Sequence, residues 1–230
     1  MLQRSIRWLA GVALFFSMSP TLAAQTVASP YRYLEEGQAV GIFVGYHDPG
    51  RARFGFGPGG GPSFGARYAV EATGPLAVEG VATFVSSSRR VIDPTLAESD
   101  WVLGEVPAEL FFLDLRLRMS LTGRRTWHGL APHILVGGGL GVSVQGLQPL
   151  DGELEPGDRF LFGNKFTPMA GAGVRYHVRE RWSVRVDGTL TLYRIDTPEG
   201  FRDPVRGFEG VEEREWISNP GLSLGLSYHF

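Results

Sequence analysis

Residues 113–121, Leu-Asp-Leu-Arg-Leu-Arg-Met-Ser-Leu, alternate between apolar and polar side chains without a break. Successive side chains of a β-strand point to opposite faces, so this stretch predicts a strand with one apolar and one charged face. The apolar face carries four leucines and a methionine, and the opposite face carries Asp114, Arg116 and Arg118. The same alternation returns in residues 182–192 and 222–230.

Read along the whole chain, this alternation predicts eight strands. They are expected at residues 39–47, 63–72, 76–86, 109–122, 130–145, 165–178, 182–195 and 216–230. Most of them have the roughly 9–11 residues or more that a tilted strand needs to cross a bilayer.

The connections between these strands alternate in length. Those at residues 73–75, 123–129 and 179–181 are short, and those at residues 48–62, 87–108, 146–164 and 196–215 are long. In a transmembrane barrel the short turns lie in the periplasm and the long loops lie outside the cell. A sheet in hydrocarbon must also close on itself, because unpaired backbone groups cannot face lipid. The sequence therefore predicts an all-β fold, an eight-stranded antiparallel up-and-down transmembrane β-barrel.

Composition excludes several classes of protein. The chain of 230 residues has 22 Lys and Arg against 24 Asp and Glu, so it lacks the basic excess of a nucleic-acid-binding protein. It has no cysteine, which rules out disulfide scaffolds, thiolate zinc sites and cysteine nucleophiles.

The N-terminus predicts export. Residues 1–24 contain Arg4 and Arg7, then an apolar run from Trp8 to Phe16, then small residues, which is the pattern of a cleaved secretory signal peptide. Residues 25–38 are expected to form a short periplasmic segment, and residues 39–230 the barrel, located in the outer membrane.

The non-apolar faces of the strands carry charges of both signs. An eight-stranded barrel is just wide enough for side chains to fill, so we expect these charges to form a structural ion-pair network in the lumen. We expect Arg116 and Arg118 to lie over a surface of small residues and to pair with Asp114, Glu71, Glu79 or Asp187. The small residues are Gly137, Gly139, Gly141, Gly171 and Gly173. The predicted network comprises Arg67, Glu71, Glu79, Asp114, Arg116, Arg118, Arg175, Arg185 and Asp187.

Large aromatic residues lie near both ends of the apolar faces. Two such girdles around an aliphatic band are typical of the two membrane–water interfaces. The outer girdle is expected from Phe64, Phe84, Phe111, Phe166 and Trp216, and the inner girdle from Tyr176, Trp182, Tyr228 and Phe230.

No motif predicts a catalytic, metal or cofactor site. The segment Gly55–Gly60 has the letters of a phosphate-binding loop, but it lacks the helix that must follow, so it indicates a flexible outer loop. The alternation places His133 and His177 on inward faces of neighbouring strands, but no His-x-x-x-His or Glu-x-x-His spacing puts two ligands on one strand face. His47 and Asp48 offer only an adjacent acid–base dipeptide.

These features resemble the small outer-membrane β-barrel family of OmpA/OmpX type. The resemblance covers residues 39–230, and its sharpest element is the alternating C-terminal strand with Tyr228 and Phe230. It implies that this strand is the signal read by the barrel-assembly machinery. It also implies that outer-membrane lipid and lipopolysaccharide surround the barrel, with no cofactor.

The leading functional interpretation is non-catalytic: envelope integrity, or surface contact through acidic outer loops. Residues 196–215 hold seven carboxylates against three arginines, which indicates either a cation- or partner-binding surface or an ordinary solvated face. The alternatives are an outer-membrane enzyme acting on lipid or peptide, a narrow pore, and a secreted soluble carrier barrel.

Overall fold

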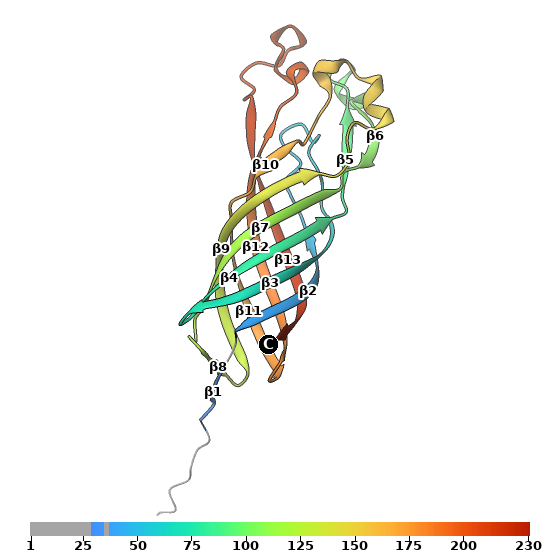
Figure 1. Cartoon of the computed structure of the whole chain (residues 1–230). Coiled ribbons are helices and arrows are strands. Elements are labelled where there is room, and N and C mark those ends of the chain that lie inside the picture. The colour runs from blue at the N-terminus through green and yellow to red at the C-terminus, as the bar shows by residue number, and fades with distance from the viewer. Residues whose placement is uncertain (1–28, 35–36) are drawn as a thin grey trace, which may run out of the picture.

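The computed structural model describes residues 29–34 and 37–230, which form a closed antiparallel barrel (Figure 1). The predicted signal peptide lies outside the described residues. The predicted fold is confirmed. The eight wall strands are β2 (Gln38–His47), β3 (Gly61–Thr73), β4 (Leu76–Val85), β7 (Leu110–Ser120), β9 (Leu130–Ser143), β11 (Met169–Arg179), β12 (Trp182–Asp196) and β13 (Arg214–His229).

Closure comes from the pairing of the last strand with the first. Each wall strand pairs with the next along the chain, and β13 pairs with β2 from Gly221–His47 to His229–Ala39. No wall strand is left with a free edge over this span, which satisfies the requirement that hydrocarbon imposes on a sheet.

Short and long connections lie at opposite ends of the barrel, as predicted (Figure 1). The inner end carries the tight turns between β3 and β4 and between β11 and β12. It also carries a ribbon in which β1 (Tyr31–Tyr33) pairs with β8 (Arg125–Trp127). The sequence did not predict this ribbon, because three-residue strands are too short to show alternation.

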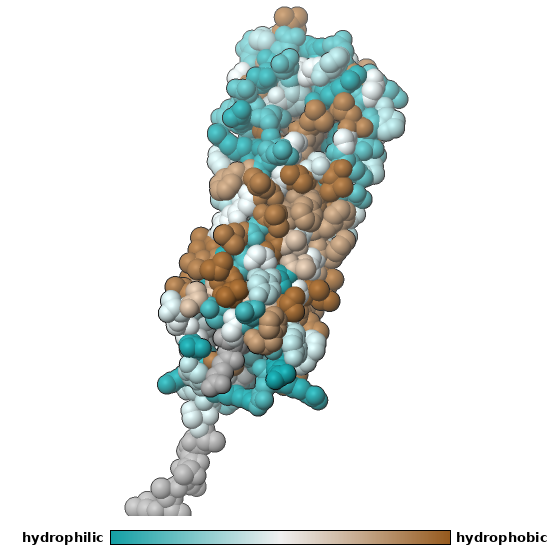
Figure 2. Space-filling view, in the orientation of Figure 1, coloured by the Kyte–Doolittle hydropathy of each residue, from teal (hydrophilic) through white to brown (hydrophobic). Residues whose placement is uncertain are grey.

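The outer surface of the wall is apolar. Ile42 is 68% exposed, Leu115 64% and Leu222 62%, whereas Arg118 on the opposite face of β7 is only 2% exposed. Figure 2 shows the resulting apolar band between a polar outer end and a polar inner end. The charged faces therefore point into the lumen and the leucine faces point outward, as the loop pattern predicted.

Both aromatic girdles are present on this outward surface. Phe64, Phe111, Phe166 and Trp216 are exposed toward the outer end. Tyr176, Trp182 and Phe230 are exposed toward the inner end, where the rings of Trp182 and Tyr228 are in contact at 5.2 Å. These positions are typical of side chains at the two membrane–water interfaces.

The prediction of one continuous strand at residues 165–178 was wrong. The segment is divided into β10 (Asn164–Phe166) and β11, with Thr167 and Pro168 between them. Proline cannot donate to a sheet ladder, so the strand is interrupted there. Thr167 maintains the connection to β9, because its N–H and C=O both bond to Gly139, at 3.0 and 3.2 Å.

The long outer loops are folded. They contain the hairpin of β5 (Ser88–Ile92) and β6 (Val102–Pro107) and a set of short 3-10 turns. These turns are η1 (Glu98–Asp100), η2 (Pro149–Glu153), η3 (Pro156–Asp158), η4 (Glu199–Arg202) and η5 (Pro204–Arg206). No helix in the described part of the chain is long and apolar enough to cross a membrane. We call the loops at residues 48–60, 86–109, 144–168 and 197–213 the outer cap.

Candidate functional site

Arg185 of β12 lies at the centre of the lumen. Its Nη1 and Nη2 donate to the two carboxylate oxygens of Glu79, at 2.6 and 3.1 Å, and its Nε donates to Asp187 at 2.8 Å. All three side chains are buried. Two parallel N–H···O bonds between guanidinium and carboxylate are the strongest geometry for such a pair. Because Glu79 belongs to β4, this contact joins opposite walls of the barrel.

Further arginines complete the hydrogen bonding of these carboxylates. Arg67 Nη1 lies 2.8 Å from Asp187 Oδ2. Arg118 donates from Nε to Glu79 at 2.8 Å and from Nη2 to Glu71 at 2.5 Å. A buried charge is tolerated when it is paired and its remaining donors and acceptors are satisfied.

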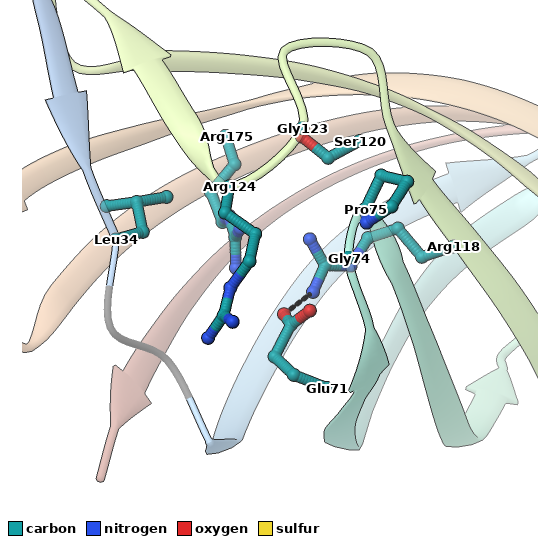
Figure 3. A pocket seen from close by; sticks show the side chains of 9 residues that line it. All are labelled: Leu34, Glu71, Gly74, Pro75, Arg118, Ser120, Gly123, Arg124 and Arg175. Atoms are coloured by element: carbon teal, nitrogen blue, oxygen red, sulfur yellow. Dashed lines mark hydrogen bonds and ion pairs between the residues drawn. The ribbon is translucent and has the colours of Figure 1, made fainter.

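The remaining charged residues of the predicted set flank this centre. Arg116 Nη2 lies 2.7 Å from Asp114 Oδ2 on its own strand. Arg175 is buried nearer the inner end, where it lines a small hollow with Glu71 and Arg118 (Figure 3). The structure thus places all nine predicted residues on the lumen side, and we call them the lumen network.

His133 joins the lumen network and was not predicted in it. Its Nε2 lies 2.9 Å from Asp187 Oδ1, and the side chain is buried. The alternation of side chains along the strand predicted that this histidine points inward, but it predicted no partner for it. The carboxylate on β12 becomes its neighbour only through the fold of the barrel.

Glycines make room for the lumen network, in part as expected. A methyl group at Gly173 would overlap Asp187 Oδ1, and one at Gly139 would overlap the Leu113 carbonyl. Gly173 therefore leaves room for a carboxylate, and Gly139 allows a neighbouring backbone to approach closely. In the wall strands, a methyl group at Gly225 would lie 2.9 Å from Arg67 Nη2, whereas the nearest atoms at the five predicted glycines belong to no guanidinium.

An aromatic cluster closes the outer end. Phe201 of η4 is fully buried, and its ring centroid lies 5.0 Å from that of Phe54, 5.6 Å from Phe56, 5.7 Å from Phe208 and 6.4 Å from Trp101. These five rings come from three of the outer loops. Buried aromatic pairs add specific ring contacts to the burial of apolar area.

The ends of the wall strands beneath these rings carry apolar side chains on the lumen side. Residues from the loop after β9 pack between the strand ends and the rings. The buried cluster comprises Phe56, Val85, Ile92, Leu110, Phe112, Phe160, Phe162, Tyr193, Ile195, Phe201 and Ile217. The expectation that the non-apolar faces of the strands line the lumen was wrong at this end, because here the inward side chains are apolar and meet the outer cap.

Ion pairs join the loops of the outer cap. Arg89 Nη2 lies 2.5 Å from Asp151 Oδ2, and Arg206 Nη1 lies 2.7 Å from Asp158 Oδ1. Burial raises the pKa of the Asp158 carboxyl, although the bond from Arg206 opposes that rise. The loop at Gly55–Gly60 lies where predicted but is packed, since Phe56 is buried within it. The outer cap is therefore a folded unit.

The histidines form no recognisable reactive centre. In residues 29–34 and 37–230, no three His, Asp or Glu side chains come together as a metal site. His47 stacks on Phe112 at 6.4 Å between ring centroids. Ser183 Oγ lies 2.7 Å from His229 Nε2, so this buried hydroxyl is already hydrogen-bonded within the barrel wall.

No protein-family model matches this chain, and no curated protein matches its sequence. Its fold does match solved structures. The crystal structure of Neisserial surface protein A aligns with a TM-score of 0.52 at 12% identity, covering 84% of this chain and 97% of that one. This chain has the fold of a small outer-membrane β-barrel.

Two further structures match with lower scores. Ail, the attachment invasion locus protein of Yersinia pestis, has a TM-score of 0.42 at 13% identity and covers 84% of this chain and 99% of its own. The N-terminal β-barrel domain of Pseudomonas aeruginosa OprF has a TM-score of 0.41 at 12% identity, with coverages of 83% and 99%. The fold and the exposed apolar band together make this chain a membrane-spanning barrel of the outer-membrane type.

Proposed function

We propose that this chain is a non-catalytic outer-membrane protein that acts through its folded outer cap while its barrel stays closed. The proposal rests on the side chains that fill the barrel at two heights, in the lumen and beneath the outer loops. Glu79 in the lumen network and Phe201 in the outer cap are both fully buried. Side chains fill the lumen of an eight-stranded barrel readily, so surfaces rather than a pore are left to perform the function.

The carboxylates of the outer cap divide into two groups. Asp151 and Asp158 are buried and bonded to arginines, so they stabilise the outer cap. In contrast, Glu209, Glu212 and Glu213 are exposed on the last loop. These three support the proposal of an acidic surface available to a partner of opposite charge. Lipid and lipopolysaccharide around the wall, and the assembly machinery at Tyr228 and Phe230, remain proposed partners.

Neutralising the exposed group tests the proposal. Cells that produce the E209Q/E212Q/E213Q variant should attach to a polylysine-coated surface at least roughly threefold less than cells with the native chain, because opposite charge steers association. The difference should shrink at high salt, where surface charges are screened. Attachment is counted by microscopy at equal amounts of surface protein.

The matched control is E209D/E212D/E213D, which keeps the charge at the same three positions. Equal attachment by the native chain and both variants would contradict a role in surface contact. Raised detergent sensitivity of cells without the chain, with attachment unchanged, would then favour the envelope-integrity alternative.

A further inference from the structure

A second hollow lies at the inner end, away from the outer cap. Its volume is about 730 Å³, and it lies between the β1–β8 ribbon, the β11–β12 turn and the end of β13. We call it the inner vestibule. It faces the periplasm, because the short turns of such barrels lie on that side.

The inner vestibule is lined mainly by cationic and neutral groups. Arg32, Arg179 and Arg181 contribute guanidinium groups, and among the residues that the structure describes the lining includes one acidic side chain, Glu180. Arg32 bonds to Glu180 at 3.2 Å, but both side chains are exposed to solvent, where such pairs are weak. The described lining side chains thus carry an excess of positive charge, although Arg181 Nη1 also donates to the Tyr228 hydroxyl at 3.3 Å.

A smaller hollow next to it continues the positive surface. Leu34 lines both hollows, and Figure 3 shows Arg124 and Arg175 lining the smaller one beside the bonded pair of Arg118 and Glu71. The guanidinium of Arg124 lies over the ring of Tyr33 of β1, at 5.4 Å from its centroid. The ribbon thus holds an additional cation at this end of the barrel.

Thr126 gives an independent indication of a ligand. This β8 residue lines the inner vestibule and is fully buried, and its Oγ1 has no hydrogen-bond partner among the described residues. A buried hydroxyl without a partner is costly. An anionic oxygen in the hollow would accept its hydrogen bond.

The depth of the inner vestibule favours a lipid headgroup as the source of such an anion. Tyr176 and Phe230 line it and are also exposed on the outward surface, in the inner aromatic girdle. Such girdles lie at the level of the lipid headgroups. The hollow therefore opens where the phosphates of the periplasmic leaflet lie.

We propose that the inner vestibule binds a phosphate group, supplied by the headgroup of an anionic phospholipid in the periplasmic leaflet. Arg179 and Arg181 bind the phosphate oxygens, and Thr126 donates its hydroxyl hydrogen. Arginine suits this role because its planar donors match phosphate geometry. The proposal depends on the membrane placement of the barrel and is independent of any role of the outer cap.

Titration calorimetry on the full refolded chain in a maltoside detergent tests this proposal. The two probes are inorganic phosphate and dihexanoyl-phosphatidylglycerol. Variant R179Q/R181Q should weaken binding of the better probe by about tenfold or more, since hydrogen bonds to charged groups are lost. Variant T126V, which keeps the side-chain shape, should weaken it by roughly threefold. The gel shift of the folded barrel reports that each variant has folded.

The matched control is R125Q, because Arg125 lies on β8 at the same end, is exposed, and lines neither hollow. It should change the dissociation constant by less than about twofold, the effect of one exposed, screened charge outside the lining. Tighter binding of the lipid probe than of phosphate supports the headgroup as source, and equal binding supports a site for free phosphate. Binding of neither probe, or equal losses in R125Q and R179Q/R181Q, would overturn the proposal.

Discussion

Replacing Arg185 with alanine is expected to lower the free energy of unfolding by about 3–5 kcal/mol, the usual cost of breaking a buried ion pair. Arg185 makes two bonds to Glu79 and one to Asp187, so its removal leaves two buried carboxylates with fewer partners. The remaining arginines, Arg67 and Arg118, already bond to these carboxylates and cannot replace all three contacts. Urea titration of the refolded barrel, followed by tryptophan fluorescence, measures the loss.

Two comparisons make this prediction specific. Arg116→Ala should cost clearly less, because within residues 29–34 and 37–230 Arg116 pairs with Asp114 alone and its side chain is partly accessible. Arg125→Ala should cost almost nothing, because exposed charges contribute little to stability. Equal stability of the native chain and the Arg185 variant would refute the assignment of this arginine to a filled lumen.

Phe201→Ala is expected to loosen the outer cap while the wall of the barrel stays folded. Truncating a buried phenylalanine typically costs about 3–5 kcal/mol, and here three ring contacts between loops and one within the loop are lost at once. Limited proteolysis of the refolded protein should cut the loops of the variant much faster than those of the native chain. The gel shift of the folded barrel should persist.

The same variant tests whether the lumen network keeps the barrel closed when the outer cap is loosened. Because the lumen network lies below the outer cap and keeps its contacts, Phe201→Ala should still show negligible steady conductance in planar bilayers. The exposed residue Val205, on the same loop, provides the control, since Val205→Ala should affect neither proteolysis nor conductance. Open channels in the native chain would favour the narrow-pore alternative.

The wall of the barrel could be predicted from the sequence because a strand displays its two faces with a period of two. Leu115 and Arg116 are neighbours in sequence and lie on opposite sides of the wall. The strand faces also supplied candidate carboxylates for Arg116 and Arg118, and these arginines bond to Asp114, Glu79 and Glu71. The contact of Arg185 with Glu79 could not be predicted, because closure brings together residues that are 106 positions apart.

The outer cap escaped prediction for a different reason. Around Leu110–Leu113 both faces of β7 are apolar, so parity cannot tell a side chain against lipid from one against the packed loops. Phe111 and Phe112 are adjacent phenylalanines, yet Phe111 is exposed on the wall and Phe112 is buried beneath the outer cap. The inner vestibule depends on the β1–β8 ribbon, which has no strand pattern of its own.

The central claim is that lipid, and not a folded core, surrounds the leucine faces of the strands. Nuclear Overhauser contacts between leucine methyl groups and lipid acyl chains, measured on the native chain in nanodiscs, test it most directly. Contacts are expected from Leu113, Leu115, Leu117, Leu222, Leu224 and Leu226 and absent from the buried Leu110 and Leu135. Acyl-chain contacts at Leu110 and Leu135, with none at the other six leucines, would contradict the account.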